Sequence, residues 1–194
     1  LMNLSYLLAL ATAFLISYFF TPLVIKFFYS RHWIEDPKVK QQKSGNATAT
    51  KPVPRGGGLP IFISIFLTSL IFLPLDKHLI GILLSTFFAL VIGLVDDVKD
   101  ISPLFRLFTN FLSASLVVAA GIGIAYVSNP FGGVFDLSQP QLSFTLMGQT
   151  HSIWLLADLL AVFWIVWCMN FVGWASGVDG QLPGFVSISA IFIG

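Results

Sequence analysis

The sequence predicts an all-α protein: a polytopic bundle of membrane helices with five full spans, a truncated sixth and its N-terminus outside. Three observations predict this class. The 194 residues are 56% hydrophobic and 10% charged, whereas soluble domains carry roughly 25% charged residues. The mean hydropathy is +0.88. The apolar residues gather in long continuous runs, and the cations gather between alternate runs. This composition excludes a disordered chain.

Each of the first five apolar runs is near the length that a helix needs to cross the hydrocarbon core. Continuous runs favour helices over the alternating pattern of a β-barrel. The first run is too long for a signal peptide and lacks a basic leading segment, so we expect it to span, with Pro22 as a kink. The runs cover about residues 4–28, 59–75, 79–95, 104–127 and 153–172, and the sixth starts near residue 185.

The chain starts at Leu1, and the sixth run stops at Gly194 before it reaches the length of a span. We therefore expect residues 1–194 to form a single transmembrane domain that is incomplete at the C-terminus. Cys168 is the one cysteine, so an intrachain disulfide is excluded.

The basic residues orient the spans. Lys99 and Arg106 flank the connection between the third and fourth runs, whereas only Lys77 lies between the second and third. The connection between the first and second runs carries six cations: Arg31, Lys38, Lys40, Lys43, Lys51 and Arg55. By the positive-inside rule, the basic connections are cytoplasmic.

This orientation places three polar segments, residues 30–58, 96–103 and 173–183, on the cytoplasmic face. Residues 128–152 lie outside, and the alternation of residues 141–146 predicts a short β-hairpin there. Asp158 lies near the outer end of the fifth run, where we expect a structural role.

The acidic residues Asp96, Asp97 and Asp100 fall together where the third run meets the cytoplasm. Three carboxylates within five residues repel one another unless water or a cation compensates them. Oxygen ligands of this kind suit Mg²⁺, which usually bridges to substrate phosphates. The alternative is a helix cap with solvated carboxylates.

A basic, glycine-rich segment, Lys51-Pro-Val-Pro-Arg55-Gly56-Gly57-Gly58, precedes the second run. Glycines let backbone amides approach an anion, and a helix N-terminus favours negative charge. This segment is either a phosphate-binding element or a positive-inside anchor with a flexible turn.

A third segment extends from Asn170 to Gly180 and carries one carboxylate, Asp179, among small residues. It is either a substrate rim or an ordinary polar turn. The orientation nevertheless places a basic, a triply acidic and a small-residue cluster on one face. Phosphate binders beside metal-binding carboxylates describe phosphoryl transfer, and the location suggests one soluble and one lipid-borne substrate.

In order and spacing, these segments resemble the polyprenyl-phosphate N-acetylhexosamine-1-phosphate transferases of glycosyltransferase family 4. The resemblance rests on four motifs that cover essentially the whole chain: Asp36-Pro37, Lys51-Pro-Val-Pro-Arg55-Gly-Gly, Gly93-Leu-Val-Asp96-Asp97-Val-Lys-Asp100 and Asn170 through Asp179-Gly180. It implies transfer of a sugar 1-phosphate from a UDP-N-acetylhexosamine to a polyprenyl (undecaprenyl) phosphate, with release of UMP and use of Mg²⁺, or of Mn²⁺ in its place.

The resemblance also implies roles for individual residues. Asp96 and Asp97 match the family's catalytic aspartate pair, with Asp96 favoured for activating the lipid phosphate. Mg²⁺ would be held by Asp97, Asp100 and Asp179. The substrates would be bound by Lys51, Arg55, Gly56, Gly57, Asn170 and Asp179.

Two positions depart from the family's pattern. Gly173 stands where the family has an asparagine, and Ser176 where it has an aspartate. A serine hydroxyl accepts a hydrogen bond but does not replace a carboxylate for Mg²⁺. Asp100 and the Pro-Arg-Gly-Gly form look more like the N-acetylglucosamine branch, with the phospho-N-acetylmuramoyl-pentapeptide branch as the alternative.

The expected partners are the two substrates and the lipid bilayer of the plasma membrane. No nucleic-acid polymer is expected at a net charge of +1, and the assembly is left open between a monomer and a homodimer. Two other functions stay as alternatives. An intramembrane prenyltransferase would need a second Asp-rich motif, and a non-enzymatic membrane subunit would not need the aspartates.

Overall fold

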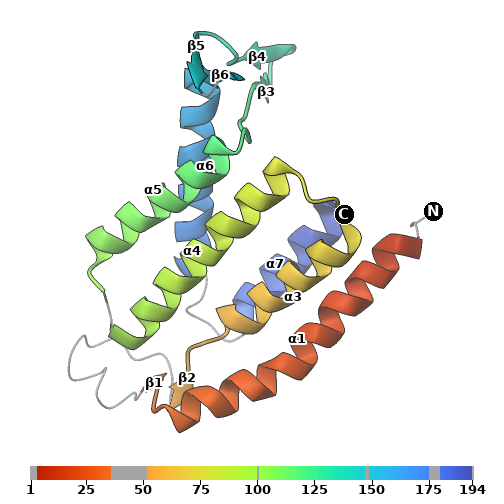
Figure 1. Ribbon diagram of the computed structural model, residues 1–194, viewed down its shortest axis with the longest axis vertical. Coiled ribbons are helices and arrows are strands. Elements are labelled where there is room, and N and C mark those ends of the chain that lie inside the picture. The colour runs from red at the N-terminus through yellow and green to blue at the C-terminus, as the bar shows by residue number, and fades with distance from the viewer. Residues whose placement is uncertain (1–3, 36–51, 100, 147–148, 175–179, 194) are drawn as a thin grey trace.

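The computed structural model describes residues 4–35, 52–99, 101–146, 149–174 and 180–193 (Figure 1). This part of the chain holds six helices and three two-stranded sheets, which confirms the helical fold class. The helices are α1 (Leu4–Ser30), α3 (Gly58–Phe72), α4 (Lys77–Lys99), α5 (Pro103–Ala119), α6 (Leu155–Trp174) and α7 (Gln181–Ile193). The strands are β1 (Ile34–Glu35), β2 (Val53–Pro54), β3 (Tyr126–Ser128), β4 (Val134–Asp136), β5 (Gln141–Leu146) and β6 (Gln149–Trp154).

Within the described residues, three helices are long and apolar enough to cross a membrane: α1, α4 and α6, with 27, 23 and 20 residues. The helices α3, α5 and α7 are apolar but shorter, with 15, 17 and 13 residues. The protein is a helical membrane protein, and the count of five full spans stays a prediction.

The fourth apolar run is shorter as a helix than expected. α5 ends at Ala119 rather than near residue 127, because the chain leaves the helical conformation at Gly121, where φ is +95°. That backbone conformation is one that glycine adopts at low cost. Tyr126 then begins β3 instead of extending the helix.

The predicted hairpin is confirmed: β5 pairs antiparallel with β6, with Leu146 opposite Gln149. Its location outside the membrane stays a prediction. A second hairpin, β3 with β4, precedes it and was not expected. Figure 1 shows both hairpins beside the start of α6, at the end of the molecule that we call the hairpin end.

The helices form neighbouring pairs: α1 with α3, α3 with α4, α4 with α5, and α5 with α6. Their directions bring the ends of α1, α4 and α6 and the starts of α3, α5 and α7 to the lower part of Figure 1. We call this the site end. The described residues of all three polar segments singled out in the sequence adjoin it.

Small side chains make the contacts among α4, α5 and α6. Ala114 and Ala157 are fully buried, and Ser113 and Ala161 are nearly so. The Ser85 hydroxyl donates to the Ser113 carbonyl at 2.6 Å, which links α4 to α5. In lipid, the hydrophobic effect does not drive helices to associate. Contacts between membrane helices therefore favour small residues, which allow the helices to approach closely. Large apolar side chains are exposed along every helix of the described part, as suits a surface that faces lipid.

We predict that Gly81→Ala destabilises the protein. A Cβ at Gly81 would lie 2.2 Å from the Cβ of Ala120, so α4 must move away from the end of α5. Overpacking of this kind costs about 1–3 kcal/mol. Thermal unfolding in detergent should show a lower midpoint. Gly93→Ala is the matched control on the same helix, because nothing lies within 4 Å of its Cβ. An equal loss in both variants would contradict this account.

Candidate functional site

Asp96 and Asp97 lie in the last turn of α4. The carbonyl end of a helix dipole disfavours negative charge, so two carboxylates here oppose the helix rather than cap it. The carboxylate at the favourable end of α4 is Asp76, which accepts from the Leu79 N–H at 2.7 Å. Asp96 and Asp97 therefore do not have the usual N-terminal position of a capping carboxylate. The carboxylates at the end of α4 need cations.

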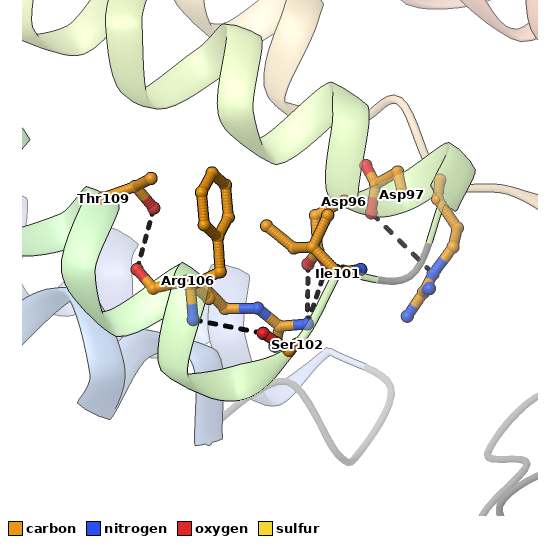
Figure 2. Close-up of polar contacts among 8 residues, drawn as sticks. Asp96, Asp97, Ile101, Ser102, Arg106 and Thr109 are labelled. Carbon is orange, nitrogen blue, oxygen red and sulfur yellow. Dashed lines mark hydrogen bonds and ion pairs between the residues drawn. The ribbon is translucent and has the colours of Figure 1, made fainter.

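Asp96 takes its cation from α5. Nη2 of Arg106 lies 2.8 Å from Oδ2 of Asp96 and donates to Oδ1 at 2.9 Å. The Ile101 N–H donates to the same Oδ1 at 3.1 Å. Figure 2 shows the Asp96 carboxylate directed at Arg106 and at the turn between the two helices. The side chain is 19% exposed. Asp96 is thus fixed by three contacts that join α4 to the start of α5.

The local sequence explains why Arg106 reaches this place. Ser102 is the N-cap of α5, and its hydroxyl accepts from the Phe105 N–H at 3.3 Å. Pro103 follows at the first helical position, where a missing N–H costs nothing. The short turn starts α5 at once, so Arg106 faces back to α4 from the first turns of α5.

Asp97 takes its cation from the start of α3. Nε of Arg55 lies 3.9 Å from Oδ1 of Asp97, a looser pair than that of Asp96. Consecutive helical residues point about 100° apart, so the two carboxylates serve different neighbours. Figure 2 shows Asp97 directed away from Arg106.

A small strand pair positions Arg55. β1 pairs with β2 antiparallel, with Ile34 opposite Pro54, and the Tyr29 hydroxyl donates to the Pro52 carbonyl at 3.2 Å. These contacts attach the residues before Arg55 to the end of α1. Arg55 is therefore held at the site end beside α4, as the sequence predicted for a basic group near the carboxylates.

The two predicted phosphate-approach glycines have different surroundings. A Cβ at Gly56 would lie 2.2 Å from the ring of Phe28, which is 1% exposed. Packing alone therefore requires a glycine at position 56. Gly57 is exposed, and nothing lies within 4 Å of the position of a Cβ there, while its N–H donates to the Arg55 carbonyl at 2.8 Å.

Two hollows adjoin α4. The larger, about 450 Å³, lies between α3 and α4 and is lined only by apolar side chains. The smaller, about 170 Å³, lies among α4, α5 and α6 and includes the Asp96–Arg106 pair. The smaller hollow is the candidate site, because binding of phosphate and sugar groups needs polar side chains. Its other lining residues are Ala89, Ile92, Gly93, Thr109, Asn110, Ser113 and Met169.

Asn170 does not join the carboxylates. Its amide donates to the Val166 carbonyl at 2.7 Å within α6, while the preceding residue, Met169, lines the pocket. Gly173 lies in the last turn of α6, with open space around its Cβ. Lys51, Asp100, Ser176 and Asp179 fall outside the described residues.

Asp158 has the structural role expected of it. Its Oδ2 accepts from the Trp154 N–H at 3.0 Å, where α6 begins at the hairpin end. It is therefore no part of the polar cluster at the site end.

The described residues supply only part of a magnesium site. They contain no group of three or more His, Cys, Asp and Glu side chains that could hold a metal ion. Both oxygens of Asp96 contact Arg106, and Asp97 pairs with Arg55 at 3.9 Å; carboxylate oxygens of this kind are hard donors that suit Mg²⁺. A complete set of magnesium ligands would need carboxylates from beyond the described residues.

Arg106 and Asn110 are the site residues that sequence reasoning missed. From the sequence, Arg106 is only one of the cations that orient the spans. Asn110 lies one turn further along α5, and its side-chain amide makes no hydrogen bond to the described residues. The spacing of four residues places both on one helix face, which is the signal that could have found them.

We predict that substitution by alanine lowers the stability of the protein at Gly56 but not at Gly57. Gly56→Ala should lower stability by about 1–3 kcal/mol, because the Phe28 ring must shift. Gly57→Ala should leave the unfolding midpoint unchanged, since its φ of −60° and ψ of −26° suit alanine. Unfolding of both variants in detergent tests this. An unchanged midpoint for Gly56→Ala would show that this turn is not packed as described.

Comparison with known proteins shows one family. A family model described as Glycosyl transferase family 4 matches residues 79–194, more than half of the chain. This stretch includes Asp96, Asp97 and Arg106. No solved structure matches the chain.

Three relatives have related names. A probable undecaprenyl-phosphate N-acetylglucosaminyl 1-phosphate transferase of Bacillus subtilis (strain 168) is 26% identical over 78% of this chain and 39% of its own length. A phospho-N-acetylmuramoyl-pentapeptide-transferase of Caldanaerobacter subterraneus subsp. tengcongensis is 29% identical over 96% of this chain and 55% of its own. A decaprenyl-phosphate N-acetylglucosaminephosphotransferase of Mycolicibacterium smegmatis is 28% identical, over 74% and 34%. The chain thus spans about half the length of these relatives, or less.

Proposed function

We propose that this chain, which belongs to glycosyl transferase family 4, carries part of the active site of a sugar-1-phosphate transferase. The donor would be a UDP-N-acetylhexosamine and the acceptor a polyprenyl phosphate. The observation that carries the proposal is the meeting of two carboxylates with two guanidinium groups at one end of an apolar helix bundle. Phosphoryl transfer needs such groups for positioning and for neutralising charge.

In the proposed reaction, an oxygen of the lipid phosphate attacks the phosphorus that carries the sugar. A new P–O–P linkage forms, the diphosphate bond of the donor breaks, and UMP leaves with the electron pair. Asp96 orients the attacking phosphate or takes its proton, and Arg106 holds Asp96 in place. Arg55 and Lys51 bind phosphate oxygens, the absence of a side chain at the exposed Gly57 leaves room for the phosphate, and Asn170 contacts the donor.

Mg²⁺, or Mn²⁺ in its place, would be held by Asp97 together with Asp100 and Asp179. When bound, the ion would neutralise charge on the diphosphate. We assign Asp97 rather than Asp96 to this role, because Arg106 contacts both oxygens of Asp96, whereas Asp97 is directed away from Arg106.

We place the site at the cytoplasmic face of the plasma membrane. At the site end, cations lie at Arg31, Arg55, Lys99 and Arg106, whereas Lys77 lies at the hairpin end. This difference supports a cytoplasmic site under the positive-inside rule. UDP-sugars are water-soluble, so a site at this boundary can receive them while the lipid phosphate arrives from the bilayer.

N-acetylglucosamine 1-phosphate is our first candidate for the transferred group, because Asp100 completes an Asp-Asp-x-x-Asp pattern. Phospho-N-acetylmuramoyl-pentapeptide transfer is the second candidate. The coverage of 96% with the Caldanaerobacter relative favours it.

The first test uses the protein expressed from its complete reading frame, with radiolabelled UDP-N-acetylglucosamine or UDP-N-acetylmuramoyl-pentapeptide and undecaprenyl phosphate. We expect that one of the two donors gives UMP release and a labelled lipid product. Asp96→Asn and Asp97→Asn should each abolish nearly all transfer, because each removes a charge that the site needs. Asp136→Asn, an exposed carboxylate at the hairpin end, is the control and should keep normal turnover. Normal turnover in either of the first two variants would refute the assignment.

The second test concerns Arg106 as a positioning residue. Arg106→Gln should lower kcat about 10- to 100-fold, because a hydrogen bond to a charged group contributes about 1.5–3 kcal/mol. Arg106→Lys should recover part of that loss. KM for the UDP-sugar should change little if Arg106 acts through Asp96. Arg31→Gln, an exposed cation at the same end, is the control. A raised KM with unchanged kcat would instead make Arg106 a donor-binding residue.

A further inference from the structure

The β3–β4 hairpin carries apolar side chains that no part of the described chain covers. Phe131, in the turn between the strands, is 97% exposed, and Phe135 is 54% exposed. Residues 121–135 contain no Lys, Arg, His, Asp or Glu. Exposed apolar groups of this kind mark a surface that contacts a partner or a membrane.

The two faces of the hairpin differ. Side chains alternate along a strand, and directly paired residues share a face. Val127 is paired with Phe135, so one face is apolar. Tyr126 is paired with Asp136 and Ser128 with Val134, so the other face carries the polar groups. The hairpin is therefore amphipathic.

Asp136 identifies the face of the β3–β4 hairpin that contacts water. The Ser138 side chain and its N–H, which lies 2.9 Å from Oδ1, hold the pKa of the Asp136 carboxyl below its ordinary value. The carboxylate is charged at neutral pH and must remain in water. The apolar face with Val127 and Phe135 points the other way.

The base of the hairpin is fixed at the level where α6 begins. The Ile124 N–H donates to the Ala157 carbonyl at 3.4 Å, and a Cβ at Gly123 would lie 2.8 Å from Oδ1 of Asp158. α6 has 20 residues, so it is about 30 Å long, which matches the hydrocarbon thickness of a bilayer. Its first turn therefore lies at the hydrocarbon boundary.

We propose that the β3–β4 hairpin lies in the headgroup layer at the membrane face opposite Asp96 and Asp97, with its apolar face and Phe131 against lipid. Strands of three residues reach about 10 Å, comparable with the headgroup layer, so the hairpin stays within that layer. The membrane fits as the occupant for two reasons. The base of the hairpin is bonded to the first turn of α6, an apolar helix long enough to cross a membrane, and the one charged residue of the two strands, Asp136, lies on the polar face.

The test measures depth with a nitroxide label. The complete protein, with its native cysteines replaced, receives a single cysteine as Phe135→Cys or Phe131→Cys, and Ser128→Cys serves as the matched control on the polar face. Each labelled variant is reconstituted into vesicles of phosphatidylethanolamine and phosphatidylglycerol. Collision rates are then measured with oxygen, which concentrates in lipid, and with a nickel chelate, which stays in water.

Labels at positions 131 and 135 should collide severalfold more with oxygen, relative to nickel, than the label at 128. Equal, nickel-rich collisions at all three positions would overturn the proposal, because the hairpin would then stand in water. Low collision with both reagents at 135 would also overturn it, because protein rather than lipid would cover that face. Neither result depends on the enzymatic activity proposed above.

Discussion

The close approach of α4, α5 and α6 is the contact on which the site depends. The small, buried side chains of Ser85, Ser113, Ala114 and Ala157 let α5 pack closely against α4 and α6. In lipid, close packing and interhelical hydrogen bonds such as that of Ser85 contribute to holding helices together. This packing also aligns the end of α4 with the start of α5. Arg106 can meet Asp96 because the two helices are already packed along their length.

That ion pair relieves two unfavourable placements at once. A carboxylate in the last turn of α4 and a guanidinium in the first turns of α5 each oppose their own helix dipole. Asp96 and Arg106 compensate each other at 2.8 Å, and the Ile101 N–H adds a neutral donor. A chain that used these charges only to mark the cytoplasmic boundary would not need them at the disfavoured helix ends. Their position favours use in chemistry.

Most of the fold could be predicted from the sequence, because long apolar runs and the distribution of cations reflect the bilayer itself. The end of α5 could not. The residues around Gly121 are apolar and extend the run in composition, and only a positive φ shows that the helix has stopped. In the site, Asp96, Asp97 and Arg55 were predicted from local motifs, and the structure brings them together. Arg106 was missed as a partner, and the packing reason for Gly56 was missed too. Each depends on a neighbour, Asp96 or Phe28, that only tertiary packing brings close.

The different surroundings of two consecutive aspartates follow from helix geometry. Residues in sequence lie about 100° apart around α4, so one carboxylate must face α5 when the other faces α3. Asp96 meets its cation closely and has both oxygens engaged, whereas Asp97 meets Arg55 at 3.9 Å. Two adjacent carboxylates can therefore have two different roles without competing for one cation. In our proposal these roles are the orientation of the lipid phosphate and the binding of the metal. The division rests on which helix each side chain faces, so it does not depend on which sugar is transferred in the proposed reaction.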